Sequence, residues 1–248
     1  MGQINLNEGW KAQRVWASYW RGECNCIIEV NNENGTEYYS IGETEFGMLG
    51  QGSNEKGDKI KESKAFSKLE ISDKDTKFKQ ISLGGSHALA IDQNDQLWAW
   101  GCNSSFQTGI QTETEEGFFK PTKVPFVETL KLKVLKVDAG KSHSLIQAVD
   151  ENGKKKMFSL GGRNESMFRF LGVSKELAAG EQPYHEIIAF SELDVLDFSA
   201  TRDHSMIIMA GEEKPTDNLY VHKLPGGEAQ GLIHFYQNED GSWTYLSE

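Results

Sequence analysis

Histidine and cysteine side chains are the first candidates for chemistry in this sequence, because imidazole and thiolate groups bind metals and act as bases or nucleophiles. Three histidines, His87, His143 and His204, recur at similar intervals, and Cys24 and Cys26 lie two residues apart. In a strand, that spacing places both thiols on one face. No second Cys/His pair follows at the spacing of a zinc site. We therefore expect structural thiols and neither a metal nor another cofactor.

Sequence signatures of common enzyme classes are missing from the chain. It has no Gly-x-x-x-x-Gly-Lys-Ser/Thr, Gly-x-Ser-x-Gly or His-Glu-x-x-His pattern, so a phosphate loop, a serine-hydrolase elbow and a zinc-protease helix are not predicted. Carboxylates are too numerous for a catalytic pair to be chosen by spacing. The sequence therefore predicts a protein that is not an enzyme and has no catalytic residues.

The histidines belong to a segment that recurs along the chain. Residues 84–89 (Gly-Gly-Ser-His-Ala-Leu) are similar to residues 140–145 (Gly-Lys-Ser-His-Ser-Leu) and 201–206 (Thr-Arg-Asp-His-Ser-Met), and residues 22–25 (Gly-Glu-Cys-Asn) form a degenerate copy ending in Asn25. The anchor positions 25, 87, 143 and 204 are separated by 62, 56 and 61 residues. Because these positions are equivalent in successive units, we expect the imidazoles to lie apart, each bonding between neighbouring strands or sheets.

A second anchor follows each of the first three copies, as an apolar and aromatic run that ends in glycine. The runs are Tyr38–Gly42, Leu97–Gly101 and Met157–Gly161, and their glycines are 59 and 60 residues apart. Between the two anchors lie short β-prone runs joined by polar residues such as Asp92–Gln96, a composition typical of hairpins. Units of about 60 residues with several short strands are typical of propeller blades, whose sheets bury their faces against one another.

Both anchors carry a family resemblance. Gly-x-x-His-Ser/Ala-Leu, then a hairpin and the run Trp98-Ala99-Trp100-Gly101-Cys102-Asn103, resembles the regulator of chromosome condensation repeat, and Gly42–Gly52 is similar to a second conserved segment of that family. The resemblance covers about residues 14–211 and implies an all-β fold, a β-propeller whose ring usually has seven blades. It implies structural repeat roles for Gly22, Asn25, Gly42, Gly84, His87, Trp100, Gly101, Gly140, His143, Gly161 and His204.

The sequence predicts a partial ring of about four blades. The units are anchored near residues 22–52, 84–110, 140–172 and 201–211, so residues 1–211 are assigned to the propeller. Four blades leave open edges and uncovered faces, and we expect another chain, further sequence or self-association to complete the ring. Residues 212–248 are assigned to an acidic segment with a β-hairpin, which either caps the last blade or begins another domain.

Two connecting segments have alternative interpretations. Ser53–Lys79 contains eight lysines and six acidic residues and is either a solvated loop or a partner-binding insertion. Gln111–Phe119 is either an acidic loop that anchors a basic partner, or a connection whose phenylalanines pack on the blade. The candidate partner-binding residues are Glu113, Glu115, Glu116 and Phe118.

The charge balance limits the partners and the compartment. With 26 basic and 37 acidic residues the net charge is −11, which argues against nucleic acid or an anionic membrane surface as the partner. The sequence has no apolar run near the roughly 20 residues of a membrane span and no secretory signal. Its three cysteines fit a reducing compartment, so a cytoplasmic or nuclear location is predicted.

These observations favour a non-enzymatic protein–protein interaction platform built from propeller repeats. The family resemblance adds two alternatives, a guanine nucleotide exchange factor for a Ran-like small GTPase and the propeller portion of a larger ubiquitin ligase. An ultraviolet-sensing branch of the family carries Gly-Trp-Arg-His-Thr at the first anchor, which this chain lacks. Trp98 and Trp100 alternate with Ala99, so they share one face of a strand and are interpreted as blade core.

Overall fold

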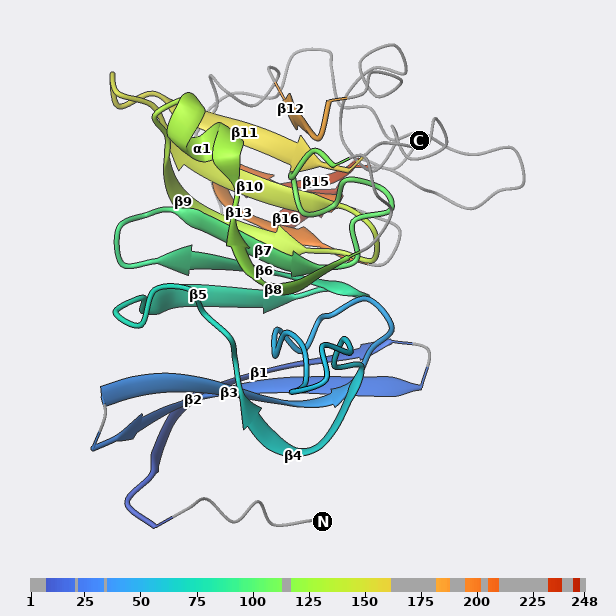
Figure 1. The fold of residues 1–248 in the computed structure, drawn as a ribbon. Helices are drawn as coiled ribbons and strands as arrows, with labels where there is room; N and C mark the ends of the chain where they lie inside the picture. The colour runs from blue at the N-terminus through green and yellow to red at the C-terminus, as the bar shows by residue number, and fades with distance from the viewer. Residues whose placement is uncertain are drawn as a thin grey trace.

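The structure is a computed structural model in which four four-stranded sheets follow one another in chain order and stack face to face (Figure 1). It describes residues 8–20, 22–33, 35–112, 117–161, 182–187, 195–201, 205–209, 232–237 and 243–245. This arrangement confirms the predicted all-β fold and its division into propeller blades.

Each sheet takes its strands from one stretch of the chain. The first sheet contains β1 (Lys11–Trp20), β2 (Glu23–Asn32), β3 (Gly35–Glu43) and β4 (Glu62–Lys68). The second contains β5 (Phe78–Leu83), β6 (His87–Asp92), β7 (Leu97–Gly101) and β8 (Phe118–Lys123). The third contains β9 (Lys133–Ala139), β10 (Ser144–Val149), β11 (Lys155–Leu160) and β12 (Tyr184–Glu186). The fourth contains β13 (Val195–Ala200), β14 (Ser205–Met209), β15 (Leu232–Gln237) and β16 (Trp243–Tyr245).

The strand pairs within the first three sheets are antiparallel, whereas β14 and β15 of the fourth sheet pair in parallel. The expected hairpin near the C-terminus is present as the antiparallel pair β15–β16, and it supplies the outer half of the fourth sheet. A short helix, α1 (Pro125–Thr129), joins β8 to β9. In the described part of the chain, no helix has the length and apolarity needed to cross a membrane.

Three hydrophobic cores lie between successive sheets. The core between the first and second sheets contains Tyr38, Phe78, Trp98 and Trp100. Because the second and third sheets are covered on both faces, every residue of β6 and β7 is buried, as are the first five of β10. In β3 of the first sheet, buried positions alternate with partly exposed ones. The remaining two cores are built around Val137, Ile146 and Phe158, and around Leu145, Phe198 and Ile207.

The predicted hairpin turns share one pattern of hydrogen bonds from the backbone to an aspartate side chain. The Asp92 carboxylate accepts hydrogen bonds from the backbone N–H groups of Asn94 (2.8 Å) and Gln96 (3.0 Å). Asp150 does the same with the N–H groups of Asn152 (2.9 Å) and Lys154 (3.0 Å). A short acidic side chain that bonds two and four residues ahead closes a turn without a long loop. These hydrogen bonds stabilise the turns that connect β6 to β7 and β10 to β11.

One expectation for the connecting segments needs correction. The interpretation of Ser53–Lys79 as a loop misses β4, which pairs with β3 and closes the outer side of the first sheet. Charged residues hide this strand in the sequence because an outer strand exposes much of both its faces. The rest of the segment includes a bridge between Ser53 and Lys59.

Candidate functional site

The first anchor links the second sheet to the third, and the third sheet to the fourth, through a buried histidine. His87 Nε2 lies 2.7 Å from Ser144 Oγ in the third sheet, and His143 Nε2 lies 3.1 Å from Ser205 Oγ in the fourth. Ser144 Oγ donates to the carbonyl of Gln107 (2.8 Å), so His87 must donate from Nε2. These contacts are the bonds between neighbouring sheets that the repeat leads one to expect. His204 lies outside the described residues.

The buried imidazole of His87 is held neutral. Full burial lowers the pKa of His87 to about 3, and the nearby His143 acts in the same direction. Its Nδ1 has no hydrogen-bond partner among the described residues. Within these residues, no group of three or more histidine, cysteine or carboxylate side chains is gathered in a way that could hold a metal. The contacts of His87 and His143 with serines of the next sheet link neighbouring blades.

The glycines of the second anchor face the first anchor across neighbouring strands. His87 pairs with Gly101, and a Cβ on Gly101 would lie 2.6 Å from the His87 Cα. Asn25 occupies the same place in the first sheet, where a Cβ on Gly42 would lie 2.5 Å from its Oδ1. Gly42, Gly101 and Gly161 all have positive φ, at 139°, 94° and 120°. The two anchors keep one period because they are two sides of one contact.

Gly84 and Gly140 lie where successive sheets approach most closely. A Cβ on Gly84 would lie 2.3 Å from the carbonyl oxygen of Gly140, and one on Gly140 would lie 2.5 Å from that of Thr201. Backbone hydrogen bonds cross the same contacts, from Gly85 N to Gly140 O (3.0 Å) and from Lys141 N to Thr201 O (3.1 Å). Only glycine permits this approach.

Gly22 has the same place in the repeat but another role. It lies in the β1–β2 turn with φ at 90°, and a Cβ there would meet nothing within 4 Å. Strand β1 continues to Trp20 before this turn, so the first sheet does not press a glycine against the second. Glycine is thus favoured at this repeat position for two different physical reasons, a close contact between sheets and a turn with positive φ.

The first strands of the four sheets, which we call the inner strands (β1, β5, β9 and β13), carry a repeated β-bulge. The register of each shifts at one residue, and the residues skipped are Gln13, Lys79, Leu135 and Leu196. The residue after each bulge is then aimed at a neighbouring inner strand. Sequence reasoning missed this feature, because the four bulged residues share no residue type.

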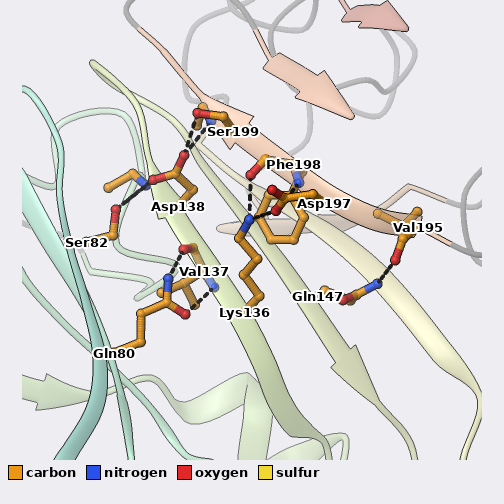
Figure 2. Close-up of polar contacts among 12 residues, drawn as sticks. Gln80, Ser82, Lys136, Val137, Asp138, Gln147, Val195, Asp197, Phe198 and Ser199 are labelled. Atoms are coloured by element: carbon orange, nitrogen blue, oxygen red, sulfur yellow. Dashed lines mark hydrogen bonds and ion pairs between the residues drawn. The ribbon is translucent and has the colours of Figure 1, made fainter. Parts of the chain in front are cut away.

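Polar side chains after the bulges bind the inner strands to one another (Figure 2). Gln80 donates to the carbonyl of Val137 (2.8 Å), and Lys136 donates to the carbonyl of Phe198 (2.9 Å). Lys136 also forms an ion pair with Asp197. Partial burial lowers the pKa of the Lys136 ammonium. In the first sheet, the post-bulge residue Arg14 donates to backbone carbonyls of β5.

Asp138 joins three inner strands in succession. Ser82 of β5 donates to Asp138 Oδ1 (2.8 Å), while Ser199 (2.9 Å) and the Ala200 N–H (2.8 Å) of β13 donate to Oδ2 (Figure 2). A carboxylate satisfied by three donors from two neighbouring strands fixes its surroundings. These contacts connect the inner strands of the second, third and fourth sheets.

The three cysteines differ in exposure, and the thiol of Cys26 is not activated. Cys24 is exposed, Cys26 is half-buried and Cys102 is buried. Burial raises the pKa of the Cys26 thiol, with Cys24 acting in the same direction. A raised pKa disfavours the thiolate, the reactive form. The structural role expected for the three thiols stays a prediction.

An exposed aromatic residue lies beside the predicted acidic loop. Phe46 follows β3 and is 39% exposed, and the exposed residues Glu43 and Glu45 precede it in the chain. Its carbonyl oxygen would lie 2.2 Å from a Cβ on Gly117, the residue that follows the acidic segment 113–116. We call Glu43, Glu45 and Phe46 the Phe46 patch. Sequence reasoning missed it, although Phe46 lies within the second family segment.

The predicted anchor Phe118 is placed differently. It is half-buried in β8 and packs against the cores on both sides of the second sheet. This position fits the alternative in which the phenylalanines pack on the blade. Glu113, Glu115 and Glu116 lie outside the described residues.

A shallow cavity of about 300 Å³ lies where the ends of the four inner strands meet. Its lining includes Trp20, Leu83, Gly140 and Thr201, one residue from each sheet or the turn that follows it. The Lys141 ammonium lies 5.5 Å from the centroid of the Trp20 ring. Such a lining suits a partner side chain that makes van der Waals contact.

Stacked four-stranded sheets with buried histidines between them define a β-propeller repeat protein, and comparison with known families gives the type of repeat. Two models described as the regulator of chromosome condensation (RCC1) repeat match residues 78–107 and 94–147. Residues 78–147 therefore match the regulator of chromosome condensation repeat. This confirms the family resemblance drawn from the two anchors.

Similar curated proteins share only part of their length with this chain. The ultraviolet-B receptor UVR8 of Arabidopsis thaliana is 33% identical over 123 residues, which are 49% of this chain and 25% of that protein. The regulator of chromosome condensation of Mus musculus is 35% identical over 75 residues, 30% of this chain and 16% of that protein. The guanine nucleotide exchange factor SRM1 of Saccharomyces cerevisiae is 29% identical over 89 residues, 34% of this chain and 18% of that protein.

Solved structures support the fold. Human WBSCR16 matches with a TM-score of 0.58 at 17% identity, over 84% of this chain and 47% of that one. Prp20p of Saccharomyces cerevisiae, described with its binding to Gsp1p and histones, matches with a TM-score of 0.50 at 21% identity, over 75% of this chain and 41% of that one. The chain thus spans less than half of these propellers.

Proposed function

We propose that this chain is a non-enzymatic platform for protein–protein interaction and that its partner presents a basic surface. The observation that carries the proposal is the Phe46 patch, an exposed aromatic side chain that follows two exposed acidic residues in the chain. Aromatic residues supply much of the binding energy at interfaces, and carboxylates around them select a cationic partner. The net charge of −11 draws such a partner over a longer range.

Residues near the patch extend the proposed surface. Gly117 adjoins the Phe46 carbonyl, and in the chain Gly117 is attached to the acidic residues Glu113, Glu115 and Glu116 that precede it. We include these three carboxylates in the proposed surface on the strength of their charge and of that attachment. Phe118 is left out because its ring packs within the sheets.

Binding of purified core histones tests the proposal, because a solved relative is described as binding histones. We expect the wild-type chain to bind them and added salt to weaken the complex. Phe46→Ala should weaken binding about tenfold, as expected for loss of an aromatic anchor. Leu130→Ala is the matched control, since Leu130 is 42% exposed and follows α1.

Two results would contradict this function. If the wild-type chain fails to bind histones at low salt, the basic partner is wrong. If Phe46→Ala and Leu130→Ala bind as tightly as the wild type, the Phe46 patch is not the surface that binds. Isothermal titration calorimetry gives both answers in one series.

Nucleotide exchange on a small GTPase is the second candidate, favoured by the similarity to SRM1 and to Prp20p. Exchange needs no reactive side chain, because a protein that binds the nucleotide-free GTPase better lowers nucleotide affinity. Release of fluorescent GDP from Gsp1p separates the two functions. Acceleration would establish exchange, whereas the platform proposal expects the spontaneous rate.

Other expectations about partners and location remain predictions. The expected lack of a nucleic-acid partner rests on the net charge alone. The predicted cytoplasmic or nuclear location rests on the cysteine content. Localisation of the tagged protein by microscopy would test the second expectation.

A further inference from the structure

The same position of the inner strand is buried in three sheets and exposed in the first. Ile81, Val137 and Phe198 are 3%, 0% and 3% exposed, and each pairs with the residue three positions after the first anchor. Val15 has this place in β1, because it pairs with Ile28, three residues after Asn25. Val15 is 64% exposed. The four positions differ in whether a neighbouring sheet covers the side chain.

In the second, third and fourth sheets this residue faces the preceding sheet. Ile81, Val137 and Phe198 each belong to the core shared with that sheet. Because side chains alternate along a strand, Ala17 and Tyr19 lie on the same face as Val15. Both are exposed. We call Val15, Ala17 and Tyr19 the open face of the first sheet.

The fourth sheet carries the complementary half of the same interface. Leu89 and Leu145 are fully buried against the following sheet. Met206 has the equivalent place in β14, next to Ser205 as Leu145 is next to Ser144. Met206 and Ile208, which shares its face, are only half-buried. The chain therefore presents one half of a blade interface at each end.

We propose that a second copy of this chain covers the open face of the first sheet with its own fourth sheet. Head-to-tail contact of this kind closes when two copies cover both ends of each other. One copy spans between 40% and 47% of the similar solved propellers, so two copies supply close to a whole ring. Eight sheets lie within the range that propellers adopt.

The junction between copies would lack one polar contact that the internal junctions have. Gln80 and Lys136 donate to carbonyls of the next inner strand, but the post-bulge residue of the fourth sheet is Asp197, which cannot donate. In addition, each copy carries a charge of −11. The dimer should therefore dissociate on dilution and become stronger with added salt, because salt screens the repulsion.

Sedimentation equilibrium over a range of concentrations tests the dimer. The wild-type chain should reach twice the monomer mass, and Val15→Glu should stay monomeric at the same concentration. Leu135→Glu is the matched control, since Leu135 is 46% exposed on β9 but lies at a bulge of a covered sheet. A wild-type monomer throughout, or equal loss of the dimer in both variants, would overturn the proposal.

Mixing variants tests the head-to-tail arrangement. Ile208→Glu should also be monomeric, because it alters the other half of the interface. A mixture of Val15→Glu and Ile208→Glu should form some dimer, since each mixed pair retains one unaltered junction. If Ile208→Glu remains folded by tryptophan fluorescence and dimerises like the wild type, the contact is not head-to-tail. Histone binding through the Phe46 patch uses other residues, so the two proposals fail independently.

Discussion

His87 shows at the scale of a residue how burial ties stability to pH. Its pKa is about 3 in the folded chain, whereas an unfolded histidine titrates near 6.5. Below about pH 6.5 the unfolded chain therefore binds a proton that the folded chain does not, and stability falls as the pH falls towards 3. Burial lowers the pKa of His185 as well, in the same direction.

The expected loss is about 2 kcal/mol of unfolding free energy from His87 between pH 7 and pH 5. Urea unfolding at the two pH values measures it. His87→Asn provides the comparison, because asparagine occupies the same place in the first sheet at Asn25 and does not titrate. The variant should be less stable at pH 7 but lose less on acidification. An equal loss in both proteins would show that another group controls the acid sensitivity.

Gly101 is a second residue whose environment predicts a mutation. A Cβ there would lie 2.6 Å from both the His87 Cα and the Ser86 carbonyl oxygen, and φ is 94°. Gly101→Ala should cost about 3 kcal/mol, from backbone strain together with the collision. Gly57→Ala is the control, with φ at 87° and nothing within 4 Å, and should cost about 1 kcal/mol. Thermal unfolding of the two variants compares these costs, and similar losses would contradict the collision.

These residues also show what sequence could and could not predict. The sequence reveals the two anchors as similar residue patterns that recur at one spacing, because each has a residue type that geometry requires at that place. Phe46 was not singled out, because exposure is a property of neighbours distant in sequence. The role of Gly22 was equally hidden in the sequence. Glycine at this repeat position permits a close approach between sheets in the second and third sheets, but forms a turn in the first.

At the scale of the element, Asp138 is the residue through which one strand holds two others. Asp138→Asn replaces one acceptor oxygen with an amide donor, which must face either Ser82 or the Ala200 N–H. We expect a loss of about 2 kcal/mol in unfolding free energy. Asp197→Asn is the control on β13, and its exposed pairing with Lys136 should contribute less than about 1 kcal/mol. Equal losses in urea unfolding would show that the link across three strands adds nothing.

Strands were predicted best where both neighbours cover them. The runs around His87–Asp92 and Leu97–Gly101 are almost wholly apolar because they are buried on two faces. Strand β4 was missed because its lysines and serines suit an outer strand as well as a loop. The bulges of the inner strands were missed because backbone register leaves no single residue type behind.

At the scale of the whole molecule, the period of about 60 residues predicted the stack of sheets, and the structure confirms it. The sequence also predicts a partial ring of about four blades, with which the four described sheets are consistent. The partner could not be predicted, because propellers of one fold serve unrelated tasks. The partner is selected by residues in loops and on exposed faces, and these residues do not recur with the period of the repeat.

The parallel pairing of β14 with β15 has a consequence for how the chain folds. In the β10–β11 hairpin the first contact joins Val149 to Lys155, and the later pairs zip from there. Ser205 with Leu232 and Met209 with Tyr236 are all equally distant in sequence, so no short first loop exists. The outer half of the fourth sheet should form last and open first, and hydrogen exchange should find its amides less protected than those of β10. If the amides of β15 exchanged more slowly than those of β10, this predicted order of assembly would be wrong.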